Sequence, residues 1–144
     1  MRRKDREQNT EFAKKVIDTS PYGVVSMCDG SNAPYCVPLS LVRDGDKLYF
    51  HAALEGKKTE LLRQNPAVCV CFADGVKPIA EKFTTAYRSA IVKGNASEIT
   101  DDREKIHALR LICQKYAPEN LSNFDEAISC SLDRTAVWAI TIDN

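Results

Sequence analysis

The sequence lacks the features that mark membrane, secreted and nucleic-acid-binding proteins. No apolar run approaches the roughly 18 residues that a membrane-spanning helix needs, and no apolar segment follows the basic N-terminal residues as it does in a secretory signal. The 20 basic and 20 acidic side chains cancel to a formal net charge of zero, so the broad positive field that attracts nucleic acid or anionic membrane is missing. We therefore expect a cytoplasmic protein that binds no nucleic acid and no membrane.

None of the six cysteines forms a Cys-x-x-Cys pair, so the commonest zinc and thiol-redox spacings are absent. In a reducing cytoplasm we expect free thiols. Cys69 and Cys71 lie two residues apart in a predicted strand and share one face, which favours two small buried residues. A zinc site is the less favoured alternative, because it requires these two to converge with Cys28, Cys36 or His51.

The length of 144 residues fits a single domain, residues 1–144, and the hydrophobic and charged fractions of 44% and 28% are ordinary for a globular protein. Periodicity, capping residues and Pro or Gly breaks divide the chain into short segments. The predicted helices are 10–18, capped by Thr10, then 56–64 and 101–116, capped by Asp101, with partly helical structure over 119–130. The predicted strands are 23–28, 35–42, 47–52, 67–73, 85–99 and 136–142.

Short strands joined by tight turns predict an antiparallel sheet. The Asp44-Gly45 pair is typical of a hairpin turn and leaves no room for the crossover that a parallel pair needs. Pro38 inside a strand indicates a sheet edge, and Gly94 inside a long strand indicates a bulge or sharp bend. We therefore predict a mainly β (α+β) fold, a six-stranded antiparallel split β-barrel with flanking helices.

The segment from His51 to Lys58 has the features of an anion site. A strand ends near His51, and a helix begins near Gly56 with Lys57 and Lys58. Helix N-termini present free amide N–H groups that favour phosphate, and glycine permits close approach of the backbone. The spacing is not that of a Walker loop. The alternative is a pair of solvated lysines on a surface helix, which is the more common situation for exposed lysine.

Two further segments suggest contacts to a flat ring or an anion. Pro38 leaves backbone groups between Val37 and Ser40 without ladder partners, and a heteroaromatic ring with donors and acceptors at its edge would satisfy them; an ordinary edge strand is the alternative. Arg88 falls on an otherwise apolar strand face and needs an anionic partner. That partner is either a carboxylate, such as Glu81 or Glu98, or a cofactor phosphate.

His51 follows an apolar strand and lies a few residues before the anion-site pattern, so a functional role and a structural hydrogen-bonding role are both open. No Ser–His–Asp or Cys–His spacing is specific enough to indicate covalent catalysis.

Several segments together make the sequence similar to the split-barrel flavoproteins related to pyridoxamine 5′-phosphate oxidase, and within them to the nitroimidazole resistance (Nim) group. The segments His51–Lys58 and Tyr87–Ser89 are the most specific. The supporting segments are residues 1–6, 34–42, 48–50, 65–66, 90–94 and 137–143.

The resemblance implies a homodimer that holds FMN at the subunit interface. It implies that backbone around Val37 to Ser40 meets the ring edge, that Lys57 and Lys58 hold the phosphate with help from the second subunit, and that Tyr87 to Ser89 lie near the ring or ribityl chain. His51 corresponds to a histidine near the flavin and is the expected catalytic residue, whereas Ala52 replaces a frequent glycine. The expected cofactor-binding residues are Val37, Pro38, Leu39, Ser40, His51, Ala52, Lys57, Lys58, Tyr87, Arg88 and Ser89, with no metal ligand.

By the same resemblance we expect an oxidoreductase. Its flavin would take electrons from a reduced nicotinamide and pass them to a small electron-poor substrate such as a nitroimidazole, with His51 donating a proton or positioning the substrate. A non-catalytic protein that stores or senses flavin or haem is the alternative, because relatives of this barrel also use haem or deazaflavin.

Overall fold

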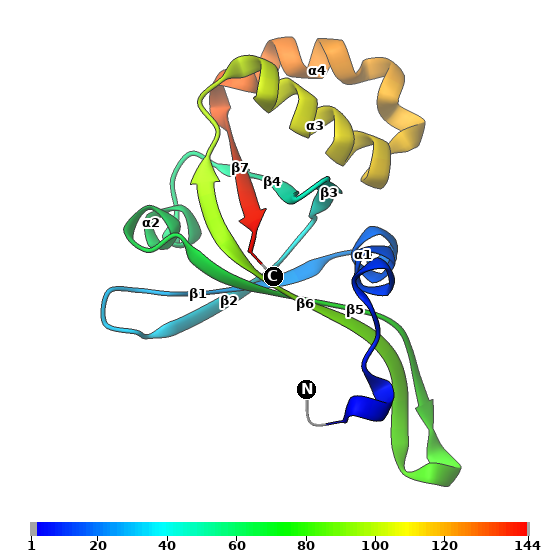
Figure 1. Cartoon of the computed structure of the whole chain (residues 1–144). Helices are drawn as coiled ribbons and strands as arrows, with labels where there is room; N and C mark the ends of the chain where they lie inside the picture. The colour runs from blue at the N-terminus through cyan, green and yellow to red at the C-terminus, as the bar shows by residue number, and fades with distance from the viewer. Residues whose placement is uncertain (1–2, 144) are drawn as a thin grey trace.

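A seven-stranded antiparallel sheet forms the body of the protein in the computed structural model, which describes residues 3–143 (Figure 1). The strand order is β2-β1-β5-β6-β7-β4-β3. The strands are β1 Gly23–Cys28, β2 Pro34–Leu39, β3 Val42–Asp44, β4 Lys47–Ala53, β5 Ala67–Ile79, β6 Thr84–Glu98 and β7 Thr135–Ile142. The predicted α+β class with an antiparallel sheet and flanking helices is confirmed, with one strand more than the six expected.

The additional strand arises because the predicted strand 35–42 is interrupted at Ser40 and Leu41. The Leu41 carbonyl accepts hydrogen bonds from Lys115 Nζ at 2.9 Å and from the Tyr116 hydroxyl at 2.6 Å, in place of a ladder partner. Pro38 does lie on an edge strand, as predicted, since β2 is at one end of the sheet.

Four α-helices flank the sheet: α1 Thr10–Thr19, α2 Lys57–Gln64, α3 Asp102–Tyr116 and α4 Phe124–Ser131. Asp101 caps α3 as predicted, accepting a hydrogen bond from the Glu104 amide at 2.9 Å. The predicted cap of α1 is wrong: Asn9 accepts from the Phe12 amide at 2.9 Å, and Thr10 is already helical. Short 3-10 turns cover η1 Lys4–Arg6, η2 Ala80–Lys82, η3 Pro118–Asn123 and η4 Leu132–Arg134. Within residues 3–143, no helix combines the length and the apolar character that a bilayer crossing demands.

Strand pairing places one residue of each neighbouring strand in the same row, and alternation gives each row one face of the sheet. On the inner face the rows consist of apolar residues. One such row consists of Val37, Val25, Val70 and Val92, in the order of the strands β2, β1, β5 and β6. The Phe50 and Trp138 rings, which pair across β4 and β7, stack with centroids 6.4 Å apart. A second apolar cluster joins β3, β4 and β7 to α3.

Within one chain, no helix of the described residues covers the outer face of the same four strands. Its two central rows are Pro38–Val24–Cys71–Ile91 and Cys36–Ser26–Cys69–Lys93. Cys69 and Cys71 share a face as predicted, but the expectation that both are buried is wrong, because Cys71 is exposed. Among the described residues, no three His, Cys, Asp or Glu side chains are close enough to hold a metal ion.

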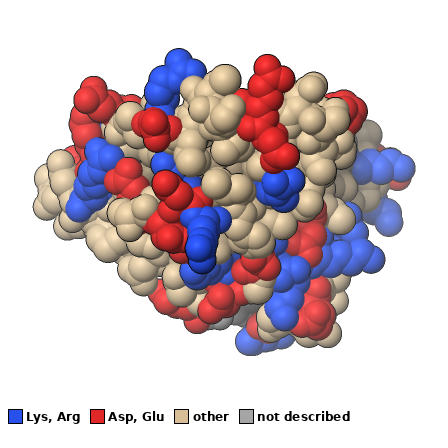
Figure 2. Space-filling model, turned by 90° about the horizontal axis from the view of Figure 1, so that it is seen from above, with Lys and Arg blue, Asp and Glu red and all other residues tan. Residues whose placement is uncertain are grey.

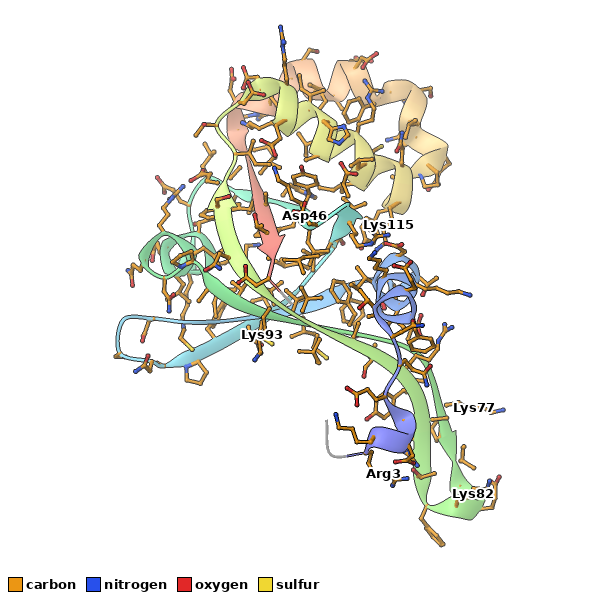
Figure 3. The ribbon with its side chains drawn as sticks, viewed as in Figure 1. Arg3, Asp46, Lys77, Lys82, Lys93 and Lys115 are labelled. Atoms are coloured by element: carbon orange, nitrogen blue, oxygen red, sulfur yellow. The ribbon has the colours of Figure 1, made fainter. Side chains whose placement is uncertain are left out.

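Strands β5 and β6 extend past the body as a hairpin arm, residues 74–89, that bends away from the sheet (Figure 1; Lys77 and Lys82 are labelled on it in Figure 3). The register shifts between Asp74 and Lys77, which makes a bulge. Arg88 pairs with Asp74 through two contacts of 2.7 and 2.9 Å, so neither of the carboxylates proposed from the sequence is its partner. Thr19 of α1 also donates to Asp74, which ties α1 to the base of the arm.

Gly94 is not at a bulge, since β6 pairs in regular register on both of its sides. Its role is close packing: a Cβ atom built there would lie 2.2 Å from the Thr141 carbonyl oxygen of β7. The surface itself mixes both signs of charge, and Figure 2 shows basic and acidic side chains interspersed over the face seen from above.

Candidate functional site

A pocket of about 260 Å³ lies where the two ends of the sheet leave strand edges unpaired. β2 pairs with β1 on one side, and β3 covers β4 only as far as Tyr49, so the segment 50–53 and β2 both have free backbone groups in the described chain. The start of α2 completes the pocket. Its lining residues are Tyr35, Val37, Ala52, Ala53, Glu55, Gly56, Lys57, Lys58 and Thr59.

Gly56 sets the geometry at the start of α2. Its φ of 135° lies in a region that L side chains rarely adopt, so glycine is required there. Among the side chains that the structure describes, none caps the helix, and the Thr59 hydroxyl instead donates to the Gly56 carbonyl at 2.7 Å. The first amides of α2 are therefore available to an anion in the pocket, and the helix dipole favours one.

Lys57 and Lys58 approach this pocket without a carboxylate partner. Among residues 3–143, neither ammonium lies within 4.0 Å of a carboxylate oxygen. Lys57 Nζ is 4.5 Å from the centroid of the Tyr35 ring, and Lys58 Nζ is 5.8 Å from that of Phe50. Burial lowers the pKa of Lys58 below its ordinary value. A bound phosphate would offset this desolvation with charge-assisted hydrogen bonds, so the residues present fit an anionic group.

A second, more open hollow of about 590 Å³ adjoins the edge strand on its outer side. Three of the residues predicted to meet a ring, Pro38, Leu39 and Ser40, line it. Val37 instead lines the 260 Å³ pocket that contains Lys57 and Lys58, which we call the lysine pocket. The remaining lining residues are Pro21, Tyr22 and Val24.

His51 lies beside the lysine pocket but lines neither hollow. It pairs with Val137 across β4 and β7, and its side chain is on the exposed side of β4 while Ala52 is buried. Part of the side chain reaches the surface, but surrounding protein atoms remove much of the water around the imidazole. This desolvation lowers the pKa of His51 below the ordinary 6.5, and the positive charge of Lys58 lowers it further. The imidazole is therefore mostly neutral at neutral pH.

Tyr87, Arg88 and Ser89 belong to the hairpin arm and line neither hollow. One chain therefore brings together Val37, Ala52 and the two lysines, whereas Tyr87, Arg88 and Ser89 lie elsewhere. Tyr35, Glu55 and Thr59 are pocket residues that the sequence did not single out. Strand alternation from Val37 was the signal available for Tyr35.

Comparisons with known proteins agree with this architecture. A family model described as pyridoxamine 5′-phosphate oxidase matches residues 10–144. The chain is similar to a structure described as a 5-nitroimidazole antibiotic resistance protein from Bacteroides thetaiotaomicron, with 29% identity, a TM-score of 0.79, and coverage of 96% of this chain and 82% of that one. No curated protein matches.

Two more distant structures share the fold. One is the FAD and heme binding protein from Mycobacterium smegmatis, with 22% identity, a TM-score of 0.80, and coverage of 96% of this chain and 69% of that one. The other is a FAD-binding protein from Mesorhizobium loti, with 20% identity, a TM-score of 0.69, and coverage of 95% and 91%. With the family model spanning nearly the whole chain, the protein belongs to the pyridoxamine 5′-phosphate oxidase family.

Proposed function

We propose that the protein binds FMN in the lysine pocket and acts as an oxidoreductase on small electron-poor molecules such as nitroimidazoles, using a reduced nicotinamide. The observation that carries the proposal is the pair of lysines at the start of α2, where residues 3–143 provide neither a carboxylate partner for the lysines nor a side-chain cap for the helix. The unpaired edges of β2 and β4 beside them offer donors and acceptors to a flat heteroaromatic ring. Family membership and the flavin ligands named for similar structures support the same cofactor class.

Flavin supplies the electron transfer chemistry when bound, and the residues of this chain supply binding and orientation. Lys57, Lys58 and the first amides of α2 hold a phosphate. Val37 and Ala52, which line the same pocket as the lysines, contact the ring. Because the lowered pKa of His51 keeps it neutral, we assign it to positioning a substrate by an N–H hydrogen bond rather than to supplying a stored proton.

A second copy of the chain is part of the proposal. The outer face of β2, β1, β5 and β6 exposes an apolar row in which Ile91 is 57% exposed, and the arm exposes Phe83 and Tyr87. Exposed apolar surface of this kind marks an interface. Since Tyr87, Arg88 and Ser89 line neither hollow of their own chain, we propose that they serve the pocket of the partner.

The absorption spectrum of the purified protein, followed by turnover of reduced nicotinamide, tests this function. We expect the two-band flavin spectrum, release of FMN on heating, and oxidation of reduced nicotinamide that increases when a nitroimidazole is added. A single intense haem band, or a colourless protein that does not take up added FMN, would contradict the cofactor. A bound flavin without turnover would leave a storage or sensing role.

The pKa of His51 provides a separate prediction. In the free protein its proton NMR titration should have a midpoint below 6.5, and Lys58→Gln should raise that midpoint by removing a nearby positive charge. Addition of FMN should also raise it, because the phosphate neutralises Lys58. His107→Gln assigns the resonances, since only two histidines are present. A midpoint that Lys58→Gln leaves unchanged would contradict the neighbouring placement.

The same lowered pKa links His51 to stability. The folded state binds fewer protons at His51 than the unfolded state does. The contribution of His51 to the free energy of unfolding is therefore fully present above pH 6.5, and it is lost as the pH falls through the pKa of the folded state.

A further inference from the structure

Within the described part of the chain, the Lys57 ammonium contacts an aromatic ring and no carboxylate. Its ammonium nitrogen lies 4.5 Å from the Tyr35 ring centroid, within the range over which a ring face attracts a cation. Both residues line the same pocket. The ring attracts the ammonium without forming an ion pair, whereas a directly bonded carboxylate would neutralise the charge and compete with an anionic ligand. The Asp29 carboxylate interacts with Lys57 only at longer range.

The two lysines of the pocket are held differently. Lys58 is half-buried, and its nearest ring, Phe50, is fully buried in the core, so the body of the protein sets its position. Lys57 is exposed, and among the described residues Tyr35 is the only aromatic side chain that contacts its ammonium. Tyr35 is itself half-buried and packs against the core from β2. It therefore supports a side chain that is otherwise exposed to solvent.

Fixing a lysine before the ligand arrives has a direct effect on affinity. A free lysine loses rotamer freedom when it binds an anion, and this loss opposes binding. A lysine already resting on a ring at the pocket wall has lost part of that freedom. The advantage applies only to a ligand with a group that reaches the ammonium. In a flavin that group is the terminal phosphate and not the ring.

We propose that Tyr35 is a positioning residue that holds Lys57 for a terminal phosphate and so makes the pocket select phosphorylated over unphosphorylated flavin. The inference rests on the proposed flavin function. Tyr35 acts through Lys57, so its contribution should disappear when the lysine is removed.

The test compares the dissociation constants of FMN and riboflavin by flavin fluorescence titration. For Tyr35→Leu we expect the preference for FMN over riboflavin to fall by about three- to ten-fold, with riboflavin affinity nearly unchanged. Tyr35→Phe keeps the ring and should retain the preference. Tyr35→Met is a second variant without a ring, to be used if the leucine variant does not fold.

A double-mutant cycle with Lys57→Gln isolates the coupling between the two side chains. In the Lys57→Gln background, Tyr35→Leu should have no further effect on the preference. Equal weakening of both flavins by Tyr35→Leu would show that the ring contacts the flavin itself and would overturn the inference. If the wild type prefers FMN and Tyr35→Leu retains that preference, only the positioning role fails. If the wild type binds neither flavin, both the proposed function and this inference fail.

Discussion

Replacing Lys57 and Lys58 together by alanine should weaken FMN binding by roughly 3–6 kcal/mol, because each charge-assisted hydrogen bond to the phosphate contributes about 1.5–3 kcal/mol. This corresponds to a loss of affinity of about two to four orders of magnitude. Both ammonium groups lie at the pocket and have no carboxylate partner among the described residues, so an anion is the contact they lack. Isothermal titration of the apoprotein with FMN measures the effect.

A matched control is the pair Lys14→Ala and Lys15→Ala. These residues are also adjacent lysines on a helix, and Lys14 forms a surface ion pair with Glu11 at 2.7 Å. Surface pairs of this kind contribute little, so FMN affinity should be unchanged in the control. Equal FMN retention in both double variants would mean that Lys57 and Lys58 are solvated surface residues.

Gly94→Ala should destabilise the protein by about 3 kcal/mol or more, at or above the upper end of the usual cost of overpacking. The new Cβ would lie 2.2 Å from the Thr141 carbonyl oxygen, which is backbone and is fixed by the pairing of β6 with β7. Relief of the contact requires β6 and β7 to separate at this residue pair. Urea unfolding followed by circular dichroism measures the change.

Gly30→Ala is the control for this substitution. Gly30 lies in the turn between β1 and β2, and a Cβ there has no neighbour within 4 Å. Its cost should remain within about 0.5 kcal/mol, as for most surface substitutions. A Gly94→Ala variant as stable as this control would show that β6 and β7 do not approach each other as closely as described.

Local signals predicted much of the fold because they depend on near neighbours in the chain. The strand at Gly23–Cys28 followed from a strand-like run that a cluster of turn residues ends, and the Asp101 cap followed from a capping box. The break at Leu41 did not, because the groups that replace its ladder partner, Lys115 and Tyr116, are far away in sequence. Figure 3 labels Lys115 at the end of α3 beside this region.

The same reasoning explains what was predictable about the site. The sequence placed Lys57 and Lys58 at a helix start after Gly56, because that pattern is local. It did not pair Arg88 with Asp74, since that contact depends on the register and bulge of a long hairpin. Local sequence patterns also could not predict that Tyr87–Ser89 lie apart from the lysine pocket of their own chain. The roles of these residues toward a cofactor stay predictions.

A structure of the protein with FMN bound tests the central claim most directly, through the distances from the Lys57 and Lys58 Nζ atoms to the phosphate oxygens. We predict that at least one oxygen lies within about 2.7–2.9 Å of each ammonium, the range of charge-assisted hydrogen bonds. Both amines directed into bulk solvent, with the phosphate held elsewhere, would contradict the account.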